Sequence, residues 1–160
     1  EIESVINDIA NQINEEYKDN NPLFLVMLNG AFMFASQLFK ELTIDCETSF
    51  VKYSTYSGTQ STCEVKELIG LNSNLKGRNV IIVEDIIDSG FTMNCLLQKL
   101  EAMEVESVKI ATMLFKPNAF KFNYKIDYIG MNIGNEFIVG YGLDYNEHGR
   151  NYASIYKVVE

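Results

Sequence analysis

Apolar side chains along the chain follow two spacings, one typical of amphipathic helices and one of buried strands. Over residues 2–17 they recur every three or four positions, which predicts a helix with one apolar face. The continuous apolar run 23–28 instead has the length and composition of a strand covered on both faces in a parallel sheet. Asn29 and Gly30 then turn the chain into a second predicted helix at about 32–41.

The remaining chain continues this alternation of strands and helices. We expect strands at 46–53, 65–69, 80–83, 108–115, 128–130 and 137–140, and a third helix at about 92–103. The polar segment 54–62 separates the first two of these strands, so they are expected to form a long hairpin. At 160 residues, the chain has the usual size of one domain. These patterns predict a single α/β domain over residues 1–160, with a doubly wound, mainly parallel sheet flanked by helices.

Composition narrows the class of protein. Hydrophobic residues make up 47% and charged residues 22%, as in folded domains. The net charge of -9 disfavours attraction to nucleic acid or anionic lipid, because such binding needs clustered cations. No apolar run approaches the ~20 residues of a membrane span, and no export signal is visible at the N-terminus. We therefore expect a cytoplasmic protein with neither a nucleic-acid nor a membrane partner.

The three cysteines, Cys46, Cys63 and Cys95, are widely spaced and have no zinc-site pattern around them. An odd number at such spacing predicts neither a disulfide framework nor a metal centre. The sequence favours reduced thiols that fill small apolar spaces.

A clear chemical signal lies at residues 80–92, where an apolar strand is followed by two carboxylates and by a turn into a helix. The carboxylates, Glu84 and Asp85, can accept hydrogen bonds from a vicinal diol or hold a hydrated magnesium ion. A purely structural interpretation makes them ordinary charges at the end of a strand. The residues themselves leave both interpretations open.

The turn that follows, Asp88 to Thr92, suits a phosphate group. N–H groups at a helix start and the hydroxyls of Ser89 and Thr92 can bind an anion, and Gly90 allows close backbone approach. An ordinary helix cap fits the turn equally well. Neither G-x-x-x-x-G-K-[ST] nor G-x-G-x-x-G occurs, which excludes a Walker loop and a dinucleotide fingerprint. A ribose phosphate is the ligand that the remaining pattern favours.

Segment 80–92 as a whole resembles the phosphoribosyl pyrophosphate signature of the type I phosphoribosyltransferases. Four further segments, 28–34, 54–59, 115–117 and 137–145, are similar in kind and order to those of the hypoxanthine and hypoxanthine-guanine phosphoribosyltransferases. The resemblance extends from about residue 5 to residue 156. It implies a Mg2+-dependent purine salvage enzyme that joins hypoxanthine or guanine to phosphoribosyl pyrophosphate, giving IMP or GMP and pyrophosphate. It also implies a long flexible hairpin flap and a small C-terminal hood over the purine.

The resemblance assigns roles in the sugar-phosphate site. Glu84 and Asp85 would hold the ribose hydroxyls, and the 5'-phosphate would lie in the turn formed by Asp88, Ser89, Gly90, Phe91 and Thr92. Asp88 would also be the catalytic base that accepts the proton of purine N7 as N9 attacks the ribose, help that is typically worth about 10²–10⁴-fold. Asp144 would share the magnesium ion with Glu84 and Asp85.

The resemblance also implies how the purine and pyrophosphate are bound. Lys116 would donate to O6 of the base, a contact that the amine of adenine cannot accept. Phe137 would stack on the purine, and the backbone of Ile138 would read its far edge. Arg150 would bind pyrophosphate bidentately. On the remaining segments, Asn29 and Gly30 would form the pyrophosphate loop, Thr55 and Tyr56 would belong to the flap, and His148 matches no catalytic position.

Two departures and several alternatives stay open. Asn29 stands where the family usually has lysine, and Thr55 where serine is commoner. In the family, the peptide of the pyrophosphate loop can be a non-proline cis bond, which the sequence does not reveal here. A xanthine-using relative and a non-catalytic nucleotide-sensing regulator of the same fold are the rival functions. Family members are usually homodimers or homotetramers, and no pattern here fixes the number.

Overall fold

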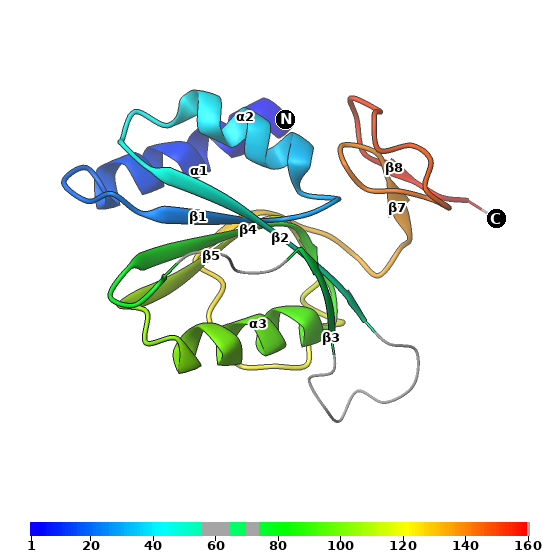
Figure 1. Cartoon of the computed structure of the whole chain (residues 1–160). Coiled ribbons are helices and arrows are strands. Elements are labelled where there is room, and N and C mark those ends of the chain that lie inside the picture. Colours follow the sequence, from blue (N-terminus) through cyan, green and yellow to red (C-terminus); the bar gives the residue numbers. More distant parts are fainter. Residues whose placement is uncertain (56–64, 70–73, 160) are drawn as a thin grey trace.

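A six-stranded sheet forms the centre of the protein (Figure 1). The computed structural model describes residues 1–55, 65–69 and 74–159. The strands are β1 (Leu23–Met27), β2 (Glu47–Thr55), β3 (Val65–Ile69), β4 (Asn79–Ile87), β5 (Ser107–Phe115) and β6 (Tyr128–Asn132). Their order is β3-β2-β1-β4-β5-β6, and every neighbouring pair is parallel except β2 with β3. The predicted mainly parallel α/β sheet is therefore confirmed.

Helices cover both faces of this sheet. Figure 1 shows α1 (Ile2–Glu16) and α2 (Phe32–Glu41) on one face and α3 (Phe91–Ala102) on the other. All five residues of β1 are buried, as its unbroken apolar sequence predicts for a strand covered on both sides. The rings of Phe24 and Phe34 have no exposed surface, and burying each stabilises the fold by about 1.5–3 kcal/mol. The core thus holds the strand ends in fixed positions.

The C-terminal residues form a separate small sheet, which we call the hood. It spans residues 137–157 and is built on β7 (Ile138–Val139) paired antiparallel with β8 (Tyr156–Lys157), and it lies beside the carboxyl ends of the parallel strands (Figure 1). The sequence predicts β7 only as part of a longer strand and gives no sign of β8. Two-residue strands carry no periodicity from which they could be recognised.

Three details differ from the sequence expectations. First, β4 continues to Ile87 because its pairing with β5 continues as far as Ile87 and Phe115, so Glu84 and Asp85 lie within the strand and not after it. Second, Cys95 is disulfide-bonded, so the prediction of reduced thiols is wrong for this residue, whereas Cys46 is free. Third, α3 begins one residue earlier than predicted. Among the described residues, no helix is long and apolar enough to cross a membrane.

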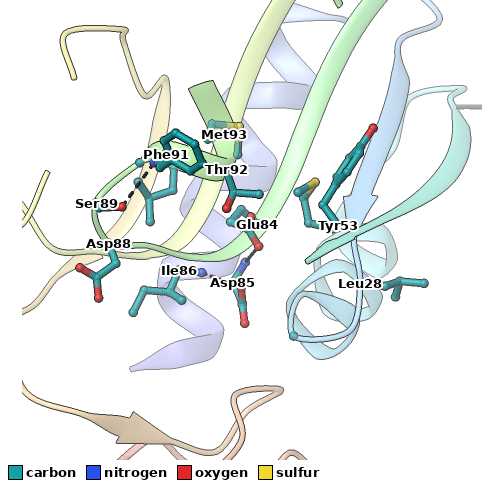
Figure 2. A pocket seen from close by; sticks show the side chains of 14 residues that line it. Leu28, Tyr53, Glu84, Asp85, Ile86, Asp88, Ser89, Phe91, Thr92 and Met93 are labelled. Atoms are coloured by element: carbon teal, nitrogen blue, oxygen red, sulfur yellow. Dashed lines mark hydrogen bonds between the residues drawn. The ribbon is translucent and has the colours of Figure 1, made fainter. Parts of the chain in front are cut away.

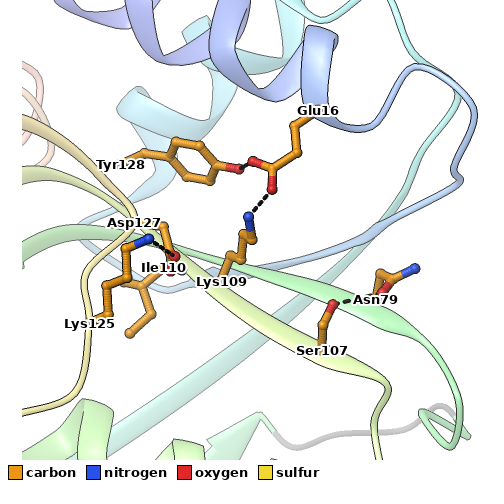
Figure 3. A network of polar contacts seen from close by, with 8 residues as sticks. All are labelled: Glu16, Asn79, Ser107, Lys109, Ile110, Lys125, Asp127 and Tyr128. Atoms are coloured by element: carbon orange, nitrogen blue, oxygen red, sulfur yellow. Dashed lines mark hydrogen bonds and ion pairs between the residues drawn. The ribbon is translucent and has the colours of Figure 1, made fainter.

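A polar network fastens α1 to the sheet at the amino ends of β5 and β6 (Figure 3). The hydroxyl of Tyr128 donates to the carboxylate of Glu16, which also forms an ion pair with Lys109. Asp127 accepts a hydrogen bond of 2.9 Å from the backbone N–H of Ile110. Burial and the neighbouring charges of Tyr17 and Asp127 raise the pKa of Tyr128. This network lies at the end of β5 opposite to the strand ends that face the hood.

Candidate active site

A pocket of about 250 Å³ opens at the carboxyl ends of β1 and β4 (Figure 2). In α/β sheets this edge is the usual place for ligands. The pocket is lined by Met27, Leu28, Gly30, Tyr53 and every residue from Glu84 to Met93. Seven predicted site residues, Glu84, Asp85, Asp88, Ser89, Gly90, Phe91 and Thr92, therefore line one cavity together with Gly30. Sequence reasoning missed Tyr53 and Ile86, because an aromatic or apolar residue inside a strand is indistinguishable from core.

The turn between β4 and α3 can bind a phosphate. Gly90 lies just before the first helical residue with φ of +85°, a left-handed conformation that favours glycine. The N–H groups of the first helical turn have no acceptor within a helix, and the helix dipole adds positive potential there. The Phe91 N–H makes only a long contact of 3.4 Å with the hydroxyl of Ser89. An anion in the pocket would find these donors available.

Glu84 and Asp85 form a half-buried acidic pair. The Asp85 N–H donates to a carboxylate oxygen of Glu84 at 3.1 Å, and the Ile86 N–H donates to Asp85 at 2.9 Å. Burial, followed by the charge of Asp85, raises the pKa of Glu84 well above its usual value. Burial also raises the pKa of Asp85, although hydrogen bonds and the positive charge of Arg150 partly oppose this. Burial thus disfavours the ionised carboxylates, and hydrogen bonds from a diol or the charge of a cation would stabilise them.

The loop after β1 lies directly against this acidic pair. A Cβ atom added to Gly30 would lie 1.7 Å from a carboxylate oxygen of Asp85, so only glycine allows the observed approach. The preceding Leu28–Asn29 peptide is cis, which answers the question that the sequence left open. Asn29 itself is exposed and does not line the pocket. The loop therefore presents the backbone of Gly30 to the acidic pair.

An ion pair joins the turn of residues 88–92, which we call the phosphate turn, to the end of β5. Lys116 Nζ lies 3.0 Å from Asp88 Oδ2, and the lysine side chain is only 8% exposed whereas that of Asp88 is 57% exposed. A lysine next to a proline is most often a solvated surface residue, but here it is buried. Figure 2 shows the side chains of Asp85 and Asp88 directed to the same side of the chain. The pair thus brings a proton acceptor and a proton donor to the rim of the pocket.

The hood contributes a second charged pair. Arg150 Nη2 lies 3.1 Å from Asp144 Oδ1, and Arg150 Nη1 donates to the carbonyl of Gly142 at 2.9 Å. The other oxygen of Asp144 accepts from the Glu147 N–H at 2.9 Å. A Cβ atom at Gly142 would lie 2.0 Å from the carbonyl of Gly30, so the hood contacts the loop after β1. Arg150 and Asp144 are thereby held near the pocket, although neither lines it.

Aromatic side chains of the hood are exposed. Phe137 is 56% exposed, and the edge of its ring meets Tyr145 with centroids 5.7 Å apart. An exposed ring at this position is not part of the core, and its free face can stack on a planar base. Ile138 follows it in β7 and is half-buried. His148, which matches no catalytic position of the family, is exposed.

Some predicted residues cannot be compared with the structure. Tyr56 lies outside the described residues, and for Thr55 the backbone alone is described, at the end of β2.

The predicted magnesium ligands do not gather into one cage: within residues 1–55, 65–69 and 74–159 there is no group of three or more potential ligands. Glu84 and Asp85 form one set of oxygen donors, and Asp144 lies in the hood. A metal ion held here would complete its coordination with water or with oxygens of a substrate.

Comparison with known proteins identifies this combination of fold and site. The profile of the phosphoribosyl transferase domain matches residues 1–146. The hypoxanthine phosphoribosyltransferase of Escherichia coli K12 is 40% identical over 162 residues, which cover 99% of this chain and 91% of that protein. A crystal structure of a hypoxanthine-guanine phosphoribosyltransferase from Bacillus anthracis has a TM-score of 0.94 at 35% identity and covers 99% of this chain and 94% of that one.

The chain therefore belongs to the phosphoribosyltransferase family, among the hypoxanthine and hypoxanthine-guanine phosphoribosyltransferases. This confirms the family predicted from the sequence. The "Bifunctional protein TilS/HprT" of Listeria monocytogenes is 39% identical over 98% of this chain, but the match covers 25% of that protein. The chain thus spans about a quarter of the length of this curated relative.

Proposed function

We propose that this chain transfers the phosphoribosyl group of phosphoribosyl pyrophosphate to hypoxanthine or guanine, producing IMP or GMP and pyrophosphate. The observation that carries the proposal is the contact between Lys116 and Asp88, 3.0 Å apart beside a phosphate turn. A sugar-phosphate site alone would suit many ligands. A buried ammonium next to an accessible carboxylate adds the two groups that a 6-oxopurine needs, one for O6 and one for the N7 proton.

Each step of the transfer has a matching group in the chain. The turn from Asp88 to Thr92 binds the 5'-phosphate through N–H groups and hydroxyls. The carboxylates of Glu84 and Asp85 accept hydrogen bonds from the ribose hydroxyls. As N9 of the purine attacks the ribose and pyrophosphate leaves, Asp88 accepts the proton from N7. This proton transfer avoids an unfavourable positive charge on the base.

Lys116 decides which bases are accepted. Its ammonium donates to the O6 carbonyl of hypoxanthine or guanine, whereas the amine of adenine offers no acceptor. The lysine is buried, and its ion pair with Asp88 leaves further N–H groups of the ammonium to donate, so a base without an acceptor here would leave a buried donor unsatisfied. Phe137 stacks on the purine from the hood, and Arg150 binds oxygens of pyrophosphate. Lys116 and Asp88 then act on the purine. Arg150, paired with Asp144, acts on the pyrophosphate.

Magnesium fits this site as an ion shared between protein and substrate. Its preferred ligands are carboxylate oxygens and water, and Glu84, Asp85 and Asp144 supply carboxylates. When bound, the ion would supply positive charge that stabilises the pyrophosphate leaving group. We also propose that copies of the chain associate as a homodimer or homotetramer, supported by the exposed Phe32 on α2 and Phe50 on β2. Light scattering of the purified protein measures this number directly.

Nucleotide formation tests the proposal. The protein is mixed with magnesium, phosphoribosyl pyrophosphate and hypoxanthine, and the product is separated and identified as IMP. An Asp88→Asn variant serves as a control that keeps the shape of the side chain and loses its ability to accept a proton. Absence of IMP from a folded protein that still binds ribose 5-phosphate would contradict the transferase and favour the nucleotide-sensing alternative.

A further inference from the structure

The segment after β5 lies behind the phosphate turn and contacts it at several points. The hydroxyl of Tyr124 donates to the carbonyl of Gly90 at 2.8 Å. The Lys121 N–H donates to the carbonyl of Ser89 at 3.1 Å. A Cβ atom at Gly90 would lie 2.5 Å from the Tyr124 oxygen and 2.6 Å from a ring carbon of Phe120. The turn therefore packs closely against residues 120–124.

These contacts fix the direction of two successive peptide groups. In a trans peptide, the carbonyl and the N–H of the next residue point in opposite directions. The Ser89 carbonyl is bound by the Lys121 N–H, and the Gly90 carbonyl by the Tyr124 hydroxyl together with the Asn94 N–H of α3, so the N–H groups of Gly90 and Phe91 point away from these donors. Both of these residues line the pocket. The anchoring of carbonyls thus aims two N–H donors at the place where a phosphate would lie.

Tyr124 is itself rigidly held. Its ring meets Phe120 edge-on with centroids 5.0 Å apart and is stacked against Phe122 at 5.9 Å. Phe120 in turn meets Phe115, the last residue of β5, at 5.2 Å. Burial raises the pKa of the Tyr124 hydroxyl, with a further contribution from the charge of Glu84, so the group stays protonated and able to donate. The aromatic cluster thereby connects the phosphate turn to the sheet.

We propose that Tyr124 is a positioning residue for the 5'-phosphate, which orients the Gly90 and Phe91 peptide through its hydrogen bond without touching the substrate. This inference rests on the proposed function, since it assumes that the turn binds the phosphate of phosphoribosyl pyrophosphate. Sequence patterns do not reveal it, because Tyr124 lies in an irregular segment with no periodicity. It differs from the roles of Asp88 and Lys116, which act on the purine.

Tyr124→Phe tests the hydroxyl while keeping the ring. Loss of one hydrogen bond that orients the donors is expected to raise KM for phosphoribosyl pyrophosphate about three- to tenfold. KM for hypoxanthine should change less than about twofold, because Lys116 and Phe137 are untouched. Tyr124→Leu removes the ring as well and should weaken phosphate binding further. Tyr128→Phe is the matched control, since it removes a hydroxyl bonded to Glu16 at the other end of the sheet.

Calorimetric titration with ribose 5-phosphate gives a readout that does not depend on turnover. Wild type and Tyr128→Phe should bind this probe equally, and Tyr124→Phe about three- to tenfold more weakly. Equal binding by Tyr124→Phe and wild type would overturn the positioning role, whatever the turnover. Weaker binding by Tyr124→Phe in a protein that forms no IMP would uphold it while the proposed function fails. Melting temperatures of all variants show whether a loss of binding comes from unfolding.

Discussion

Lys116 Nζ lies 3.0 Å from Asp88 Oδ2, although the two residues are 28 positions apart in the chain. Their proximity follows from the sheet, because β4 and β5 run parallel in a register that pairs Ile87 with Phe115. The residue after each partner therefore projects from the same edge. A carboxylate and an ammonium are thus held side by side, a spacing that would suit N7 and the exocyclic O6 on the same edge of one 6-oxopurine.

Replacement of Asp88 by asparagine is expected to lower kcat by at least about tenfold, because the amide keeps the shape and cannot accept the N7 proton. Ribose 5-phosphate binding should change little, since the backbone donors of the turn remain. Steady-state kinetics and calorimetry measure the two effects. A variant that turns over as fast as wild type would show that Asp88 is not the base.

Replacement of Gly30 by alanine is expected to displace the acidic pair. The added Cβ would lie 1.7 Å from the Asp85 carboxylate, so KM for phosphoribosyl pyrophosphate should rise by about tenfold or more. Gly77→Ala is the matched control, because Gly77 also lies in a turn and has no atom within 4 Å of the added Cβ. Its positive φ of +72° should cost about 1–2 kcal/mol of stability without affecting KM. Equal KM values for Gly30→Ala and wild type would contradict the close approach.

Glu84→Gln is expected to stabilise the protein while weakening sugar binding. The pKa of Glu84 is raised in the folded state, so the folded protein binds its proton more tightly than the unfolded chain does. The free energy of unfolding therefore falls as pH rises from the usual value of 4.5 through the folded pKa. Glutamine does not titrate and escapes this loss.

Thermal melts over a pH series measure this effect. Glu84→Gln should melt above wild type at neutral and alkaline pH, and the difference should shrink as pH falls toward 4.5. The exposed Glu101→Gln on α3 is the control and should follow wild type throughout. A constant difference between Glu84→Gln and wild type at every pH would contradict the raised pKa.

The sequence predicts most of the fold because its elements are regular. Periodic apolar positions locate α1 and α2 to within one residue, and the buried run at β1 is confirmed over its full length. The phosphate turn is equally readable, because all its residues are contiguous. The chemistry of such a segment depends only on local order, which a sequence displays.

Features that depend on tertiary contacts could not be predicted from residues alone. The length of β4 follows from its continued pairing with β5, and the bond from Tyr124 to Gly90 joins residues 34 positions apart. The raised pKa of Glu84 comes from burial, which its position among apolar residues does not quantify. Assignment of Lys116 to the purine came from the resemblance to a family, and the structure adds its burial and its contact with Asp88.

The central claim, that the site selects 6-oxopurines through Lys116, is tested most directly by a panel of bases. Wild type and Lys116→Met are each supplied with magnesium, phosphoribosyl pyrophosphate and hypoxanthine, guanine, xanthine or adenine, and nucleotide formation is followed by ultraviolet absorbance. Wild type should use hypoxanthine and guanine and reject adenine, and the xanthine sample measures the breadth of the site. In Lys116→Met, KM for hypoxanthine should rise by about tenfold or more while KM for phosphoribosyl pyrophosphate changes little. Rapid use of adenine by wild type, or a loss in the variant confined to phosphoribosyl pyrophosphate, would contradict the claim.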